Sequence, residues 1–189
     1  ADHFTSFILP KKPLAHLKNI LSGVNEDVHV EYSKEANHIR FSFDNLVLYS
    51  VLKEGKYPNY EAVIPKNNPK SFVVSRDEFL KSIRRVGIYS NQSTFQVRVS
   101  LSENMTNITA EDMDYSNKAA ENIAGEYTGE AMEIGFNSKF LREMLENMDS
   151  DQIRLEMSQP NHAALILPVE EFSENENLLM LIMPVMLNY

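Results

Sequence analysis

The chain of 189 residues has no cysteine, few glycines and no long apolar run, and each absence excludes a class of protein. Without cysteine there are no disulfides and no thiolate metal site, so a reducing compartment is permitted. The six glycines form no glycine-rich phosphate loop. The most apolar window, residues 178–187, is too short to span a bilayer and contains Pro184. The first residues show no signal-peptide pattern.

Catalytic and metal sites are not indicated by the remaining polar residues. The five histidines, His3, His16, His29, His38 and His162, have no metal-ligand spacing. Carboxylates cluster at residues 111–114 and 170–176, where we expect solvated acidic loops rather than a general acid–base pair. We therefore expect a non-catalytic protein without metal or cofactor, with an isolated carbohydrate hydrolase as an alternative that activity screening would test.

One pattern occurs three times along the chain, about sixty residues apart. A short apolar run passes directly into a helix-period pattern at residues 7–18, 71–80 and 132–141. Such spacing indicates a duplicated supersecondary unit. Each copy is followed by several strand-like runs. A chain that repeats one strand–helix–strands module favours a surface or a ring over a single catalytic pocket.

Capping signals and apolar stripes predict three helices. The first has Pro13 in its first turn, the second has a capping box of Ser75 and Glu78, and the third follows Asn137, a favourable N-cap. We expect the stripes to pack as core against a sheet. Their members are Leu14, Leu17 and Leu21 in the first helix, Phe79, Leu80, Ile83 and Val86 in the second, and Phe140, Leu141, Met144, Leu145 and Met148 in the third.

Alternating apolar and polar residues predict antiparallel strands with one buried face near residues 28–32, 39–43, 95–101 and 153–157. Continuous apolar runs at 163–167 and 178–183 predict strands buried on both faces. The segment 67–70, Asn-Asn-Pro-Lys, interrupts the periodicity and marks the expected domain boundary. The predicted class is α+β, with domains at 1–66 and 67–189.

The formal net charge of −9 is unevenly distributed. The predicted helices at 11–21 and 75–87 carry +3 and +2, the segment 138–148 is neutral, and the remainder carries −14. An acidic body with basic helices can attract phosphate on one face. The alternative interpretation is that these lysines and arginines are ordinary solvated side chains.

Three motifs carry a family resemblance. Gly55-Lys56-Tyr57-Pro58-Asn59-Tyr60 runs into Val63-Ile64-Pro65-Lys66-Asn67, Gly129 to Asn137 opens the third module, and Met183-Pro184 lies close to the C-terminus. In this order and spacing they resemble the inter-domain signature, a third-domain strand and the terminal motif of the bacterial DNA polymerase III sliding clamp, the beta subunit. The resemblance covers essentially the whole chain. It implies the DNA-clamp fold, with 1–66 as the second half of the middle domain and 67–189 as the C-terminal domain.

The resemblance implies a head-to-tail dimer of three-domain subunits, so we expect this chain to be a piece of a longer protein that pairs with a second clamp subunit. Helices would line a hole for duplex DNA, and antiparallel sheets would lie outside. DNA binding would be topological and non-specific, through phosphate attraction. The DNA-facing basic residues would be Lys11, Lys12, Lys18, Arg76, Lys81, Arg84, Arg85, Lys139 and Arg142.

The resemblance also implies a hydrophobic groove that tethers DNA polymerase, clamp loader and repair proteins by a short peptide of the Gln-Leu-x-Leu-Phe type. The matching positions are Pro58, Ala62, Val63, Asn137, Phe140, Asn161, Ala163, Leu181, Ile182, Met183, Pro184, Val185, Met186 and Leu187. The alternative is that 178–185 is simply the last core strand. Both can hold, because alternate residues of a strand point to opposite faces.

Departures from the family pattern alter the expected groove. The family often has arginine where this chain has Ala62 and a basic residue where it has Met186, so we expect this groove to be less positively charged. Asn188 and Tyr189 extend past the usual end and could cover part of it. At the dimer seam the resemblance places Ile88 and Tyr89, for which ordinary helix-end packing is the alternative.

The resemblance implies a cytoplasmic, nucleoid-associated bacterial protein with no membrane partner. The alternative is a secreted or surface β-rich binding domain with no DNA role. Glycosylation sequons at Asn91, Asn104 and Asn107 support it, and the absence of cysteine and of a signal pattern counts against it.

Overall fold

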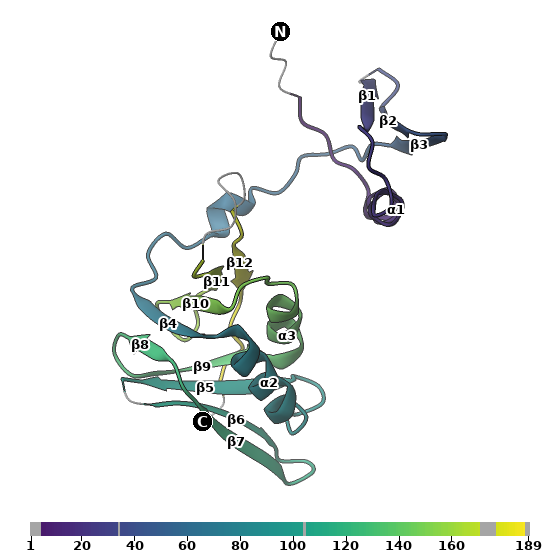
Figure 1. Cartoon of the computed structure of the whole chain (residues 1–189). Coiled ribbons are helices and arrows are strands. Elements are labelled where there is room, and N and C mark those ends of the chain that lie inside the picture. Colours follow the sequence, from purple (N-terminus) through teal and green to yellow (C-terminus); the bar gives the residue numbers. More distant parts are fainter. Residues whose placement is uncertain (1–4, 34, 104, 171–176, 188–189) are drawn as a thin grey trace. The chain divides into compact units, whose positions relative to one another are not determined.

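The computed structural model describes residues 5–33, 35–103, 105–170 and 177–187 (Figure 1). The chain forms two compact units, Ala1–Asn59 and Tyr60–Tyr189. The division between them in the sequence lies seven residues before the boundary that we expected after Lys66. In the described part of the chain, no helix has the length and apolar character needed to cross a membrane.

The first unit is a helix on a small antiparallel sheet. It contains α1 (Lys11–Leu21), β1 (His29–Ser33), β2 (His38–Phe43) and β3 (Leu46–Val51), with strand order β1-β2-β3. Ile39, Phe41 and Phe43 are buried, as their alternation predicts. Leu17 and Leu21 are half-buried against them.

Three details of this unit differ from the prediction. Strand β1 has no buried residue, and Val30, expected on its buried face, is 54% exposed. Leu14 is exposed, because the small core reaches only the later turns of α1, at Leu17 and Leu21. The first apolar run forms no strand either. Among the described residues, the backbone of residues 7–9 pairs only through an isolated bridge between Ile8 and Lys53.

The second unit begins with a short 3-10 helix, η1 (Tyr60–Val63), and contains two antiparallel sheets and two helices (Figure 1). The five-stranded sheet has the order β12-β11-β10-β4-β8, and the four-stranded sheet has the order β7-β6-β5-β9. The elements are β4 (Lys70–Ser75), α2 (Arg76–Gly87), β5 (Gln96–Ser102), β6 (Met105–Asp112), β7 (Asn117–Ile123), β8 (Glu126–Thr128), β9 (Met132–Asn137), α3 (Ser138–Glu146), β10 (Gln152–Met157), β11 (Ala164–Pro168) and β12 (Met180–Ile182).

The repeated strand–helix–strands module is confirmed here, and its two copies are interlocked. Strand β4 passes directly into α2, and β9 passes directly into α3. Each of these first strands pairs within the other module's sheet: β4 pairs with β10, and β9 pairs with β5. The two modules therefore cannot separate without breaking both sheets.

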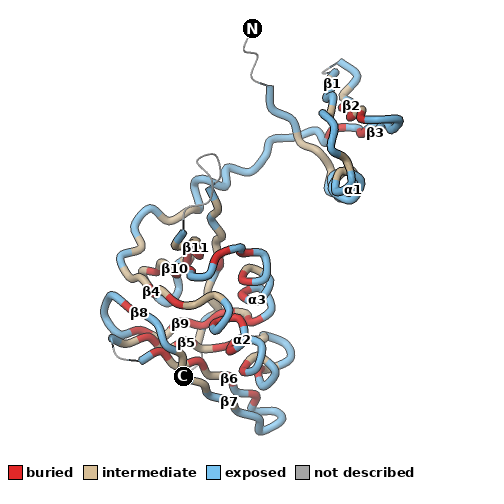
Figure 2. The backbone as a smooth tube through the Cα atoms, viewed as in Figure 1, coloured by how far each residue is buried: buried red, intermediate tan, exposed pale blue. Residues whose placement is uncertain are grey.

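One continuous core fills the space between the helices and the sheets (Figure 2). Strands contribute alternating apolar residues, and the helices contribute Phe79, Ile83, Val86, Leu141 and Leu145. Met148, predicted as part of the third helical stripe, is buried just beyond the end of α3. Each fully buried side chain of this size contributes roughly 1.5–3 kcal/mol relative to an exposed one.

Three predictions about burial in this unit are wrong. Phe140, placed in the core stripe, is 60% exposed, because it lies on the first turn of α3 outside the buried face. The run 178–183 gives only the short edge strand β12, so it is not buried on both faces. Asp112 ends strand β6 and is buried, where its carboxylate accepts a hydrogen bond from the Asp114 N–H at 3.0 Å. Residues 171–176 of the second acidic cluster lie outside the described residues.

Candidate functional site

The C-terminal segment, residues 183–187, joins the edges of the two sheets in the second unit. It leaves β12 at the edge of the five-stranded sheet, and the Val185 N–H donates to the Gly135 carbonyl of edge strand β9 at 2.8 Å. Gly135 makes this approach possible. A Cβ atom there would lie 2.5 Å from the Val185 carbonyl oxygen and 2.8 Å from Leu187 Cδ2.

Apolar side chains of this segment remain at the surface. Met183 is 61% exposed and Met186 is 70% exposed, whereas Pro184, Val185 and Leu187 are half-buried. Ile182 is buried in the core and its neighbour Leu181 is half-buried. The same short stretch therefore contributes to the core and leaves apolar surface exposed.

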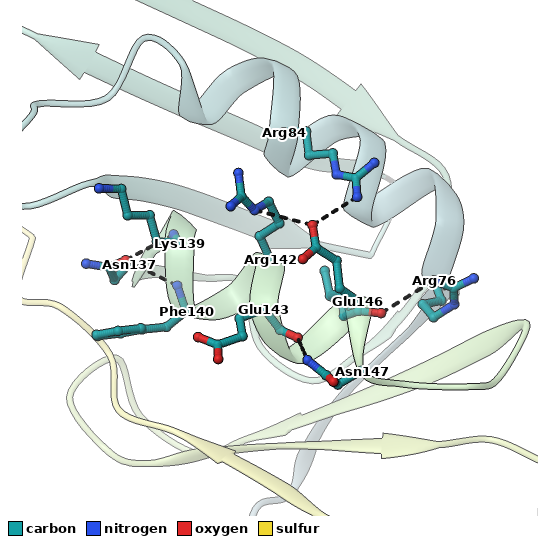
Figure 3. Close-up of polar contacts among 10 residues, drawn as sticks. Arg76, Arg84, Asn137, Lys139, Phe140, Arg142, Glu143, Glu146 and Asn147 are labelled. Carbon is teal, nitrogen blue, oxygen red and sulfur yellow. Dashed lines mark hydrogen bonds and ion pairs between the residues drawn. The ribbon is translucent and has the colours of Figure 1, made fainter. Parts of the chain in front are cut away.

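Phe140 adds a further exposed apolar group on α3, a helix that contacts β12. Its position depends on Asn137, which caps the helix as predicted. Asn137 Oδ1 accepts from the N–H groups of Lys139 at 3.0 Å and Phe140 at 3.3 Å (Figure 3). Asn137 Nδ2 donates to the Thr94 carbonyl at 3.0 Å. Both ends of this amide are already bonded, so Asn137 fixes the first turn of α3 and thereby positions Phe140.

The remaining predicted groove residues are dispersed over loops. Ala62 and Val63 are exposed in η1, Asn161 is exposed in the turn after β10, and Ala163 is half-buried just before β11. Asn68 Nδ2 links these parts, because it donates to the carbonyls of Glu156 at 3.1 Å and Ala163 at 3.3 Å. Pro58 belongs to the first unit, so its place in the groove stays a prediction.

The basic residues of α2 are mostly neutralised by carboxylates. Arg85 forms two hydrogen bonds with Glu121 on β7, at 2.7 and 2.9 Å, and Lys81 pairs with Asp77 at 2.5 Å. The hydrogen bond from Lys81 lowers the pKa of Asp77. The hydrogen bonds from Arg85 lower the pKa of Glu121. Both carboxylates are therefore ionised at neutral pH.

On α3 one carboxylate serves two arginines. Glu146 Oε1 lies 2.9 Å from Arg84 Nη2 and 3.3 Å from Arg142 Nε (Figure 3). Lys139 instead places its Nζ 3.3 Å from the centre of the Phe95 ring, in a cation–π contact.

Two sets of predicted basic residues differ in their surroundings. Arg76 donates to the backbone carbonyls of Ser150 at 2.9 Å and Leu145 at 3.4 Å, so its role is structural. Lys11, Lys12 and Lys18 are exposed on α1 and form no ion pair within the described residues.

Glu121 and Glu146 were not predicted as partners of these arginines. The spacing of four residues between Arg142 and Glu146, and between Asp77 and Lys81, is a local signal for such pairs on a helix. The Arg85–Glu121 and Arg84–Glu146 pairs join different elements and have no local signal.

Comparison with known proteins identifies the family of this chain. A family model described as DNA polymerase III beta subunit, C-terminal domain, matches residues 61–186. The chain belongs to this family. The match begins next to the division between the two compact units, at Asn59 and Tyr60.

Similar proteins agree with the assignment. The beta sliding clamp of Pseudomonas putida is 31% identical over 159 residues, which cover 84% of this chain and 42% of that protein. The crystal structure of a DnaN sliding clamp from Bartonella birtlesii, bound to griselimycin, has 31% identity and a TM-score of 0.87, covering 97% of this chain and 48% of that one. The crystal structure of the beta subunit from Thermotoga maritima has a TM-score of 0.88 and covers 99% of this chain and 49% of that chain. Its identity to this chain is 23%, so it supports the fold alone. The chain spans a little under half the length of these relatives, and its DNA-clamp fold is confirmed.

Membership of the clamp family argues against the alternative of a secreted domain. One glycosylation sequon is also used internally, because Asn107 Nδ2 donates to Asn122 Oδ1 at 2.7 Å and to the Glu121 carbonyl at 3.3 Å. A glycan on this nitrogen would disrupt the pairing side chains of β6 and β7. Asn104 lies outside the described residues.

The pair expected at the clamp's dimer seam lies just after α2. Ile88 is 77% exposed, so helix-end packing does not account for it. Tyr89 is also exposed, although less so. Their place at a seam stays a prediction.

Proposed function

We propose that this chain is the C-terminal part of a bacterial sliding clamp, a non-catalytic processivity factor that encircles duplex DNA without sequence specificity. In the whole protein it would pair with a second clamp subunit. It would tether the replicative polymerase, the clamp loader and repair proteins by short peptides that bind a common groove. Its place would be the cytoplasm, at the nucleoid.

The observation that carries the tethering role is the exposed apolar surface of the C-terminal segment. Met183 and Met186 are mostly exposed, although the backbone of the segment is fixed at Gly135. Contiguous exposed apolar surface marks interaction sites, and methionine adapts to differently shaped ligands. Each leucine or phenylalanine anchor that a peptide buries there would contribute roughly 1.5–3 kcal/mol.

The observation that supports the DNA role is the concentration of basic side chains on helices in an otherwise acidic chain. Phosphate attraction of this kind gives binding that does not depend on sequence. Many of these cations in the second unit already pair with carboxylates. We therefore expect weak binding to linear duplex.

Calorimetry with a Gln-Leu-x-Leu-Phe peptide tests the tethering role. We expect a dissociation constant no better than tens of micromolar, which corresponds to roughly −6 to −7 kcal/mol. Deletion of residues 183–189 should abolish binding, and removal of Asn188 and Tyr189 alone should leave it unchanged or improve it. A peptide with alanine in place of both leucines and the phenylalanine is the matched control. Binding of equal strength to the chain that lacks 183–189 would contradict the proposal.

A further inference from the structure

Arg84 and Arg142, which both pair with Glu146, line a cavity with positively charged side chains. This cavity of about 320 Å³ lies between the end of α2 and the start of α3. Its lining includes three cations, Arg84, Lys139 and Arg142, and among the described residues no carboxylate lines it. Ser90 and Gln92 add polar groups to the lining, and Ile83, Ile88 and Phe95 add apolar ones. Such a site has the size and charge for one phosphate group.

Glu146 lies beside this cavity and holds two of its three cations. Its Oε1 atom bonds both Arg84 and Arg142, which come from different helices (Figure 3). All three side chains are substantially exposed, from about a third to a half of their surface. Exposed ion pairs of this type are weak, so a phosphate oxygen can replace the carboxylate.

We propose that Glu146 competes with DNA phosphate for Arg84 and Arg142 and so weakens the hold of the clamp on DNA. This inference rests on the proposed DNA role. A phosphate that enters the cavity can form ion pairs with the two arginines only when they no longer pair with Glu146. The carboxylate is thus a positioning residue that lowers DNA affinity, as a protein that slides along DNA requires. Lys139, whose cation lies over Phe95, would meet the phosphate first.

The same helix offers a matched control. Glu143 lies one turn before Glu146, is exposed, and forms no ion pair in the described part of the chain. Glu146→Gln and Glu143→Gln each remove one negative charge from α3. The general gain in attraction for DNA is therefore shared, and only Glu146→Gln releases the arginines. Glu146→Asp keeps the charge but shortens the side chain, so it tests the geometry alone.

The experiment is a salt series of fluorescence anisotropy with a labelled linear duplex, on the full chain and each variant. Each phosphate contact adds about 0.9 to the slope of log K against log salt, or about threefold in affinity for a fourfold fall in salt. Two released arginines should steepen the slope for Glu146→Gln by about one to two. Over a fourfold fall in salt, the affinity of this variant for duplex should therefore gain about tenfold on that of the wild-type chain. Glu143→Gln should leave the slope unchanged, and Glu146→Asp should lie between.

The outcomes separate this inference from the function on which it rests. Equal slopes for Glu146→Gln and Glu143→Gln, with the wild-type chain binding duplex, would overturn the role of Glu146 and leave the DNA role standing. Absence of salt-dependent binding in the wild-type chain at low salt would overturn both. Adding Arg84→Gln to Glu146→Gln should remove about half of the gain in slope. A gain that survives both Arg84→Gln and Arg142→Gln would show that the effect does not pass through the arginines.

Discussion

Gly135 is the residue on which the C-terminal segment depends most directly. Substitution by alanine would place Cβ 2.5 Å from the Val185 carbonyl oxygen, so the segment has to move off β9. We expect Gly135→Ala to weaken peptide binding at least tenfold, and to lower the free energy of unfolding by about 1–3 kcal/mol, as overpacking does. Calorimetry and denaturant unfolding measure the two effects.

Gly23 provides the control for this substitution. A Cβ atom at Gly23 would meet nothing within 4 Å, so Gly23→Ala should leave peptide binding unchanged. Wild-type affinity in the Gly135→Ala chain would refute the proposal that the path of the segment forms the groove.

Ile88 separates surface function from packing. Because it is 77% exposed, Ile88→Ser should change the free energy of unfolding by no more than about 0.5 kcal/mol. Leu141→Ala, in the core of the same unit, should cost about 2–5 kcal/mol. Denaturant unfolding compares them. A loss of more than about 1 kcal/mol in the free energy of unfolding for Ile88→Ser would indicate that Ile88 serves helix-end packing.

Local signals predicted some of these residues correctly and others not. Ser75 and Asn137 cap their helices as expected, because capping depends on a few adjacent residues. The role of Phe140 was divided between core and groove, because a helical stripe does not show how far the buried face extends. Glu146 was not identified as the partner of Arg84, because that pair depends on how two helices pack.

At the level of elements, the Arg85–Glu121 pair fastens α2 to the edge strand β7. Arg85 lowers the pKa of Glu121 from its ordinary value of 4.5, so the folded state binds this proton less readily than the unfolded state. The pair therefore stabilises the fold fully above about pH 4.5, and the stabilisation is lost as pH falls through the lower, folded pKa.

A pH series of thermal unfolding tests this pair. Glu121→Gln should unfold at a slightly lower temperature than wild type at pH 7. The difference should shrink as pH falls below the ordinary pKa of 4.5 and the carboxylate of the folded state takes up its proton. Glu111→Gln serves as the control, because it removes a carboxylate from the neighbouring strand β6 whose only ion pair within the described residues is a longer, exposed one with Lys118, at 3.7 Å. A difference for Glu121→Gln that persists undiminished at the acid end would mean that it does not arise from ionisation.

The sequence predicted the helices and most strands of the second unit but not the interlocking of its two modules. Apolar runs that pass directly into helices indicate that β4 and β9 are strands. This pattern does not show which strands they pair with, and β4 joins β10 from a point about eighty residues away in the chain. The edge position of β12 was missed for the same reason, since a short apolar run looks alike at the edge and at the centre of a sheet.

At the scale of the whole molecule, three motifs were enough to indicate the clamp family, which the match over residues 61–186 establishes. The groove was predicted only as a set of positions. The structure adds that the C-terminal segment crosses from one sheet to the other and is fixed at Gly135. It also adds that most basic residues of α2 and α3 carry carboxylate partners, which composition could not show.

The most direct test of the proposed tethering role is NMR shift mapping of the full chain with the Gln-Leu-x-Leu-Phe peptide. The account predicts that the largest amide shifts cluster on residues 183–187, on Gly135 opposite Val185, and on the first turn of α3 around Phe140. The alanine-substituted peptide should produce none of them. Shifts that cluster instead on α2 around Lys81 and Arg85, or that are equal for both peptides, would contradict the assignment of the groove.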